Sequence, residues 1–393
     1  MYIIHNGLVI TEDTITDELA VVVDGKYIHS LIPTGQIAEF PGAKLIDAQG
    51  GYITPGFIDI HSDYIETIAS PRPTSMIDFN ISLREAEKIL VNNGITTMFH
   101  SLSFYRDDIF MKNPMREPNK VQEMIDLIDA KSDDLQLIRH RLHARFEIDN
   151  VNGVGQLVEN IEQNKIHLVS FMDHTPGQGQ YRNLEKYYET LRGYRDVTYD
   201  EVQTIILEKQ ACETITLEDM ERIAKLATEK NIAVASHDDD HIEKLHLVKS
   251  FGTTISEFPI TLEVAKEAKK LGFHTIVGAP NVLLGKSHSG NLSAVEAIEH
   301  GCADILCSDY YPVALLHAVF HLHEKYGFDL HEMFQKVTLN PARAVKMDDD
   351  IGSIRPGKKA DILIIEKMRD GYPMITTTMV DGVVITETNY RIY

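Results

Sequence analysis

Short apolar runs alternate with longer segments of helical pattern through the middle of this sequence, and such alternation is typical of parallel βα units. The eight apolar runs lie at residues 52–61, 94–100, 140–148, 166–174, 231–238, 253–259, 273–281 and 303–312. Eight units in about 290 residues is the size expected of a (β/α)8 barrel. The rival fold, a doubly wound open sheet, usually carries a glycine-rich turn after its first strand, and none follows here. The sequence therefore predicts an α/β fold of the TIM-barrel type.

The two ends of the chain have a different pattern from the middle. Residues 1–55 and 350–393 consist of short alternating segments, and Asp24 and Asp381 are each followed by a glycine. Asp-Gly is favoured in tight hairpin turns because both residues tolerate a positive φ. We therefore expect residues 56–349 to form the catalytic barrel and both ends to build one small discontinuous β-sandwich.

Composition restricts the partners of the protein. A net charge of −21 argues against binding to nucleic acid or acidic membranes, because both require a basic surface. Three cysteines are too few for a disulfide framework and suit a reducing compartment. The N-terminal M-Y-I-I-H-N-G lacks the layout of a signal peptide, and no apolar run approaches about 18 residues. We expect a cytoplasmic protein without a nucleic-acid or membrane partner.

Nearly every predicted strand ends in a group that binds metal or moves protons. These groups are His61, Asp63, His100, Glu147, Asp173, His174, His237, Asp238, Glu257, Asn281 and Asp309. One such residue alone means little, since histidines often lie on surfaces and acidic residues often cap helices. In a barrel, however, the carboxyl ends of all strands meet at the active-site face. Their coincidence predicts a functional site there.

The first run, F-I-D-I-H-S-D, indicates what kind of site this is. Alternate side chains of a strand share a face, so we expect Phe57, Asp59, His61 and Asp63 to point together. Imidazole and carboxylate groups are competent ligands for Zn²⁺, Mn²⁺ or Fe²⁺. A mixed histidine and carboxylate set without cysteine fits a catalytic metal site better than a structural one.

The run of five metal-binding residue types at 237–241 is less informative than it looks. His237 ends a predicted strand, and Asp238 is a candidate to join it in the site. We expect the remaining three residues to cap and solvate the next helix, because acidic residues commonly begin helices.

The third run, R-H-R-L-H-A-R-F-E, places several arginines on one face of a strand. They can form an ion-paired face under the sandwich or a loop, or a cationic stripe for phosphate oxygens. Arginine suits phosphate because its planar fork donates two hydrogen bonds at once. We favour the functional interpretation for Arg145 and Glu147 and leave Arg139 and Arg141 open.

A loop at residues 278–291 contains G-K-S-H-S-G-N. It is not a P-loop, because Pro280 stands where that motif requires a glycine. Lying just before a helical segment, the loop can still present backbone N–H groups, a cation and hydroxyls to a phosphate. The alternative is a surface loop without a ligand, and spacing alone leaves both open. The candidate phosphate-binding residues are Lys286, Ser287, His288 and Ser289.

Several strings together resemble the amidohydrolase superfamily: P-G-F-I-D-I-H-S-D, C-S-D-Y-Y-P and the tail N-P-A-R-A…I-G-S-I-R-P-G-K-K-A-D-I. A narrower resemblance is to its PhnM-type subfamily. It rests on H-S-D-Y-I-E before P-R-P, R-H-R-L-H-A-R-F-E, V-S-F-M-D-H-T-P-G-Q-G-Q-Y, A-S-H-D-D, E-F-P-I-T and G-A-P-N…G-K-S-H-S-G-N. The similarity runs in order along nearly the whole chain.

The resemblance implies a metal-dependent hydrolase with one or two divalent ions. Its implied ligands are His61, Asp63, Glu147, His174, His237 and Asp309. Asp63 stands where the superfamily has a second histidine, and no lysine ends the fourth strand, so Glu147 is the natural bridging carboxylate. Asp309 is the implied general base, and Arg72 in P-R-P is a further candidate for contact with substrate phosphate.

The subfamily implies a specific reaction in phosphonate catabolism. α-D-Ribose 1-methylphosphonate 5-triphosphate is hydrolysed to the 5-phosphate and pyrophosphate, so the expected partner is a small phosphorylated sugar phosphonate; a homo-oligomer is also allowed. The alternative is a deaminase or cyclic-amide hydrolase with the same metal centre. A third hypothesis is a relative that lost catalysis and became an interaction protein, but such proteins shed metal ligands, whereas the strand ends here retain them.

Overall fold

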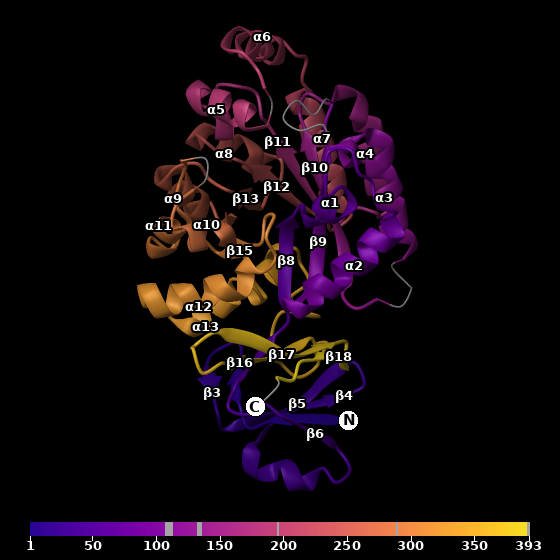
Figure 1. Cartoon of the computed structure of the whole chain (residues 1–393), viewed down its shortest axis with the longest axis vertical. Helices are drawn as coiled ribbons and strands as arrows, with labels where there is room; N and C mark the ends of the chain where they lie inside the picture. Colours follow the sequence, from indigo (N-terminus) through magenta and orange to yellow (C-terminus); the bar gives the residue numbers. More distant parts are fainter. Residues whose placement is uncertain (107–112, 132–135, 195, 288–289, 391–393) are drawn as a thin grey trace.

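The computed structural model describes residues 1–106, 113–131, 136–194, 196–287 and 290–390 (Figure 1). A barrel with a shell of helices stands on a smaller β-rich part to which both chain ends contribute. We call the carboxyl ends of the barrel strands the upper end and their amino ends, which face the β-rich part, the lower end.

Eight parallel strands form the barrel sheet in sequence order, as predicted. They are β8 (Phe57–Ser62), β9 (Ile95–Phe104), β10 (Arg139–Glu147), β11 (Leu168–Met172), β12 (Ala233–His237), β13 (Ile255–Glu257), β14 (His274–Gly278) and β15 (Ile305–Cys307). A parallel bridge between Ser62 and Asp309 joins the first strand to the segment after the last. Lower down, the carbonyls of Lys336 and Val337 accept from the N–H groups of Leu306 (3.0 Å) and Ile58 (2.9 Å). The barrel is thus closed in part by an inserted segment.

Helices surround the strands and follow local signals in the sequence. Asp78 begins one by accepting a hydrogen bond from the N–H of Ile81 (3.1 Å), and Thr216 and Asp219 form a reciprocal capping box at another. The helices are α1 (Tyr64–Ala69), α2 (Phe79–Asn92), α3 (Pro118–Ala130), α4 (Val154–Glu162), α7 (Leu217–Glu229), α8 (Ile242–Ser250), α9 (Leu262–Lys270), α10 (Ala279–Leu284), α11 (Ala294–Glu299), α12 (Ala314–Tyr326), α13 (Leu330–Gln335) and α14 (Leu339–Ala344), with 3-10 turns η2 (Pro114–Arg116), η3 (Val151–Gly153) and η4 (Gly179–Tyr181). Within the described residues, every helix is too short or too polar to cross a bilayer.

Two apolar layers hold the barrel together. The outer layer lies between strands and helices and includes Phe57, Leu90 and Phe146. The inner layer fills the barrel with Ile60 and Phe99, among others, and packs against the segment that contains α14. Because the lower interior is filled by these side chains, open space for a ligand is left at the upper end.

The β-rich part contains two sheets. One has the order β5 (Tyr27–Pro33), β4 (Leu19–Asp24), β1 (Tyr2–His5) and β6 (Lys44–Asp47), with the 3-10 turn η1 (Thr34–Glu39) after β5; the other has the order β18 (Val383–Glu387), β17 (Pro373–Val380), β16 (Ile362–Lys367), β7 (Tyr52–Pro55), β2 (Leu8–Ile10) and β3 (Ile15–Thr16). The antiparallel pairing of β16 with β7 joins the two chain ends. Ile4, Val21 and Ile53 share one core with Ile362 and Met379. The predicted combination of barrel and two-ended β structure is confirmed, while the predicted boundaries after residues 55 and 349 stay predictions.

The junction between the β-rich part and the barrel decides the role of Arg139, which the sequence left open. Its guanidinium bonds the carboxylates of Asp361 (2.9 Å) and Asp381 (2.7 Å). Arg139 is therefore part of an ion-paired lower end, the structural alternative. Arg141 donates to the carbonyl of His140 (2.8 Å) at the same end.

An excursion after β11 adds two helices beyond the upper end (Figure 1). These are α5 (Leu184–Tyr194) and α6 (Tyr199–Gln210). They have an apolar cluster of their own, which includes Tyr187, Leu191 and Val202. The excursion is anchored to the barrel by Lys209, whose ammonium lies 2.6 Å from a carboxylate oxygen of Asp149.

Candidate metal centre and active site

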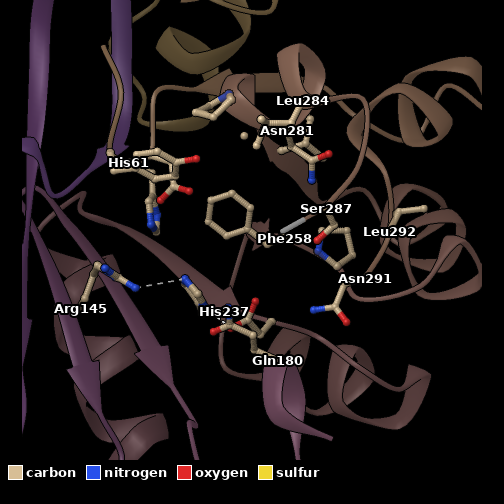
Figure 2. Close-up of a pocket in the computed structure, with 17 residues that line it drawn as sticks. His61, Arg145, Gln180, His237, Phe258, Asn281, Leu284, Ser287, Asn291 and Leu292 are labelled. Atoms are coloured by element: carbon tan, nitrogen blue, oxygen red, sulfur yellow. Dashed lines mark hydrogen bonds and ion pairs between the residues drawn. The ribbon is translucent and has the colours of Figure 1, made fainter. Parts of the chain in front are cut away.

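A cavity of about 470 Å³ opens at the upper end of the barrel (Figure 2). His61, Arg145 and His237 line one side of it, and Asn281 and Asn291 line another. Its position matches the rule that barrel enzymes build their sites at the carboxyl ends of the strands. Its size is within the usual range for a small-molecule site.

His61, at the end of β8, contacts a buried carboxylate. Its Nδ1 lies 2.9 Å from Oε1 of Glu257, the last residue of β13. Potential ligand atoms of His61, His237 and Glu257 lie within 4.8 Å of one another. The other oxygen of Glu257 is buried and makes no hydrogen bond within the described residues. The sequence placed Glu257 at a strand end but left it out of the ligand set, so this member was missed.

A second group shares His237 with the first. His174, His237 and Asp238 also offer three ligand atoms within 4.8 Å. Oδ2 of Asp238 lies 2.9 Å from Nδ1 of His237 and 3.9 Å from Nε2 of His174. His237 therefore stands between two histidine and carboxylate groups. Such donors suit a divalent transition metal.

Glu147 directs both of its oxygens at His174. Oε1 accepts from the backbone N–H of His174 (2.8 Å), and Oε2 lies 2.7 Å from its Nδ1. This contact leaves Nε2 of His174 free to bind a metal, the usual arrangement of a carboxylate that orients a ligand histidine. The bridging role predicted for Glu147 stays a prediction, since its oxygens lie outside the two groups found among the described residues.

Asp309 follows β15 and is held against β8. Its N–H donates to the carbonyl of His61 (3.1 Å), and its own carbonyl accepts from the N–H of Asp63 (2.9 Å). Burial, reinforced by the charge of the Asp63 carboxylate, raises the pKa of Asp309 to about 7. A carboxyl group that titrates near neutrality is well suited to accept a proton from water.

Asp63 itself directly precedes α1, without a capping hydrogen bond from its side chain, and faces an arginine. Its Oδ2 lies 3.9 Å from Nη2 of Arg116, whose Nε donates to the buried Glu66 (2.8 Å). Asp63 thus lies in a charged cluster beside Asp309 and outside the two groups of potential ligands in the described chain. Its role as a metal ligand stays a prediction.

The backbone is strained where strands deliver residues to the cavity. Asp238, Phe258 and Asp309 follow β12, β13 and β15, and their φ angles are +50°, +54° and +58°. Non-glycine residues in this left-handed region cost of order 1–3 kcal/mol each and cluster at functional sites. All three line the cavity.

Arg145 lines the cavity from β10. Its Nη2 lies 3.5 Å from Nε2 of His237. Its buried Nε makes no hydrogen bond in the part of the chain that the structure describes. Among the described residues that line the cavity, Arg145 is the one lysine or arginine. Its position agrees with the predicted role in phosphate binding but does not test it.

The expectation that Asp239 caps and solvates a helix is wrong. Asp239 is fully buried and accepts hydrogen bonds from the hydroxyls of Ser236 and Ser256. Lys244 lies 3.2 Å from Asp239 and donates to the carbonyl of His237 (2.7 Å). A polar run in sequence suggests solvent, but the turn at Asp238 directs Asp239 into the protein, where serine and lysine donors offset its burial. Asp239 and Lys244 together fix the turn that carries His237.

The expectation that Phe57, Asp59, His61 and Asp63 share one face is also wrong. Phe57 packs in the outer apolar layer, whereas His61 lines the cavity. The pairing of β8 with β9 shifts register after Phe57 and again after Asp59, so simple alternation fails. Asp59 is fully buried and accepts from the N–H of Ser308 (3.2 Å); burial raises its pKa to about 6.

The remaining predicted phosphate contacts are spread over the upper end. Ser287 lines the cavity, Lys286 is exposed next to it, and Arg72 is exposed in the turn after α1. His288 and Ser289 lie outside the described residues. Roles for these five residues stay predictions.

Comparisons with known proteins agree with this geometry. A sequence model described as the Amidohydrolase family matches residues 52–386. The alpha-D-ribose 1-methylphosphonate 5-triphosphate diphosphatase of Escherichia coli (strain K12) is 33% identical over 348 residues, which cover 86% of this chain and 90% of that protein. An imidazolonepropionase of Brevibacillus brevis is 23% identical over 376 residues, 87% of this chain and 83% of that one. The N-acetylglucosamine-6-phosphate deacetylase from Pasteurella multocida has the same fold, with a TM-score of 0.61 at 15% identity over 97% of this chain and 98% of that one.

Proposed function

The chain belongs to the amidohydrolase family, a family of hydrolases, and on this premise we propose that it is a metal-dependent diphosphatase. The proposed substrate is α-D-ribose 1-methylphosphonate 5-triphosphate, a compound of phosphonate catabolism. Water adds to the α-phosphorus, the bond from that phosphorus to the bridging oxygen breaks, and the products are the 5-phosphate and pyrophosphate. The support for this substrate is the 33% identity to the Escherichia coli diphosphatase over most of both chains.

The donor set at the upper end fits one or two divalent ions. One side-chain oxygen of Glu257 is buried without a hydrogen bond in the described residues, while Nδ1 of His237 and Oδ2 of Asp238 contact each other at 2.9 Å. Buried polar atoms without partners are costly, and a cation offsets that cost for acceptors of this kind. We propose that His61, His174 and His237 hold the ions with Glu257 and Asp238, and that Asp63, Glu147 and Asp309 contribute as the family resemblance implies.

A divalent ion held by these residues would act as a Lewis acid and would lower the pKa of a bound water towards neutrality. Zinc, manganese and iron all accept histidine and carboxylate ligands. The two ligand groups that share His237 are compatible with one ion or with two.

The observation that carries the proposal is a carboxylate that shares one cavity with an arginine and the candidate metal ligands. Asp309 accepts the proton of the attacking water. Arg145 binds the phosphoryl oxygens through its guanidinium, because its planar fork matches their geometry. Positioning and electrostatic stabilisation of this kind carry most of the catalysis in phosphoryl transfer.

Two exposed cations complete the proposed phosphate site. Lys286 would bind the departing pyrophosphate from the segment after α10, and Arg72 would reach it from the turn after α1. His288 and Ser289 lie outside the described residues and stay candidates from the sequence. Location in the cytoplasm and assembly into a homo-oligomer stay predictions from the sequence.

A substrate panel tests the proposal directly. The protein is reconstituted with zinc, manganese or iron, its metal content is measured, and it is incubated with the ribose triphosphate and with simple amides and nucleobases. We expect pyrophosphate from the ribose triphosphate and no ammonia from the panel. Release of ammonia or amide cleavage without pyrophosphate would contradict the proposal.

The second candidate is a deaminase or cyclic-amide hydrolase that attacks carbon with the same centre. Among the described residues that line the cavity, Arg145 is the one lysine or arginine, and one cation is few for a triphosphate. This scarcity of cations favours the second candidate. The two candidates differ in their need for that cation. Arg145→Gln, with metal content measured as a control, should abolish pyrophosphate release if the first is right and should matter little if the second is right.

A further inference from the structure

One wall of the cavity carries polar groups without charge. Asn281, Ser287 and Asn291 come from the segments that follow β14, and we call these three residues the amide wall. Figure 2 shows them on the side of the cavity away from Arg145 and His61. The proposed reaction assigns no role to either asparagine.

The amide wall has hydrogen-bonding groups to spare. Asn281 uses its side-chain oxygen to accept from the N–H of Ala294 (3.3 Å), which leaves its NH2 group without a partner in the described chain. The side chains of Ser287 and Asn291 make no hydrogen bond to any described residue. Polar groups that line a cavity without protein partners bond to water or to a ligand, and few convergent groups of this kind usually fix the orientation of a ligand.

Charge divides the cavity into two regions. Arg145, Asp238 and Asp309 lie with the histidines at the strand ends, whereas the amide wall has no formal charge. We therefore place the reacting phosphoryl group of a ligand toward Arg145, among the candidate metal ligands. An uncharged group with hydroxyls suits the amide wall, because amides both donate and accept hydrogen bonds, as hydroxyls do.

Apolar side chains beside the amide wall fit the same kind of group. Phe258 lies between the two regions and Leu292 lies next to the wall (Figure 2), and Pro259 also lines the cavity. The C–H face of a sugar ring can pack on such surfaces while its hydroxyls reach polar groups at the edge. Neither feature would serve a bare polyphosphate, which is anionic along its whole length.

We propose that the amide wall is a subsite for the uncharged, hydroxyl-bearing pentose of a phosphorylated sugar. The amide wall determines substrate specificity, because it distinguishes a sugar triphosphate from inorganic tripolyphosphate. The inference rests on the proposed diphosphatase function and adds to it the residues that recognise the sugar.

The test compares two substrates in the metal-reconstituted full-length protein. Pyrophosphate release is measured from the ribose triphosphate and from inorganic tripolyphosphate for the wild type, for Asn291→Ala and for the control Asn119→Ala, which changes an exposed asparagine of α3 outside the cavity. One lost uncharged hydrogen bond changes an equilibrium about 3- to 10-fold. We expect the ratio of kcat/KM for the sugar substrate to kcat/KM for tripolyphosphate to fall by about that factor in Asn291→Ala and to stay unchanged in Asn119→Ala.

A double variant extends the range of the measurement. Asn281→Ala combined with Asn291→Ala should lower the same ratio further, and thermal unfolding of the double variant checks that loss of the bond to Ala294 has left the fold intact. A wild-type protein that hydrolyses both substrates equally, or an Asn291→Ala variant whose ratio is unchanged, would overturn the inference while leaving the diphosphatase proposal standing. Absence of pyrophosphate from both substrates in the wild type would overturn the proposed function, and the inference with it.

Discussion

The two ends of the barrel both bury charged groups, but they treat them differently. At the lower end, Arg139 is held between Asp361 and Asp381. At the upper end, Glu257 and Arg145 each keep a buried polar atom without a hydrogen bond in the described chain, and Asp309 has a strained backbone. Paired charges stabilise a fold, whereas unpaired ones cost stability and persist where a ligand will meet them. The lower end is built for stability and the upper end for binding and catalysis.

The largest expected effect is at the upper end. Asp309→Asn removes the proposed base while keeping the size of the side chain, so kcat for pyrophosphate release should fall by about 10²- to 10⁴-fold. Metal content and thermal unfolding should stay close to those of the wild type. Asp349→Asn, at an exposed position, is the matched control and should leave kcat unchanged. Near-wild-type turnover by Asp309→Asn would remove the main contrast between the two ends.

The next effect is at the lower end, where a substitution should lower stability and leave kcat unchanged. Arg139→Met leaves the buried carboxylate of Asp361 without its partner, and breaking a buried pair in this way costs about 3–5 kcal/mol of unfolding free energy. The kcat value should hardly change. Arg141→Met is the control, because within the described residues Arg141 bonds a carbonyl and no carboxylate. Equal losses of stability from both variants in chemical denaturation would show that the pairing of Arg139 does not matter.

A smaller effect is expected behind the metal centre. Lys244→Met removes the donor to the carbonyl of His237 and the partner of Asp239, and the loss of such supporting contacts typically weakens metal binding by about 10- to 100-fold. Competition with a chelator measures the metal affinity. Lys249→Met, at an exposed position of the same helix, should bind metal like the wild type. If the two variants bind metal equally, the network does not position His237.

The last prediction concerns pH and the lower end, and its effect is small near neutrality. Burial, with the charge of Arg141, lowers the pKa of His167 to about 3, and its Nδ1 accepts from the N–H of Leu142 (3.1 Å). Below a pH of about 6.5, the unfolded chain binds a proton at this residue that the folded chain does not, so the free energy of unfolding falls from there down to about pH 3. His167→Gln should make this decline shallower in denaturation measured across pH. A variant with an unchanged pH profile would contradict the assignment.

Much of the fold could be predicted because it depends on periodic patterns. Each of the eight apolar runs overlaps one barrel strand, and the two ends of the chain share a core. The ends of the predicted strands also identified His61, His237 and Asp309 as neighbours, since parallel strands deliver their carboxyl ends to one place. These features could be predicted because regular backbone geometry imposes a repeating pattern of apolar residues on the sequence.

The details of the site correspond to no repeating pattern in the sequence. Asp239 looks solvated in the sequence but is buried, because the left-handed turn at Asp238 redirects the chain. Phe57 and His61 are an even number of positions apart, so a regular strand would place both on one face. Register shifts between β8 and β9 place them on different faces. The contact of Glu147 with His174 joins residues from different strands, which spacing along the chain cannot reveal. Turn geometry and contacts across strands decide these cases.

The pairing of β7 with β16 sets an order for folding during synthesis. β7 ends at Pro55 and its partner begins at Ile362, so the sheet that contains both can be completed only after the whole barrel has left the ribosome. Domains generally fold as units while the chain emerges, from the N-terminus first. The barrel strands therefore pair while Ile53 and Val9 still lack the cover of Ile362 and Met379. A chain that ends before β16 leaves Ile53 and Val9 without that cover, so residues after the barrel complete a core that begins before it.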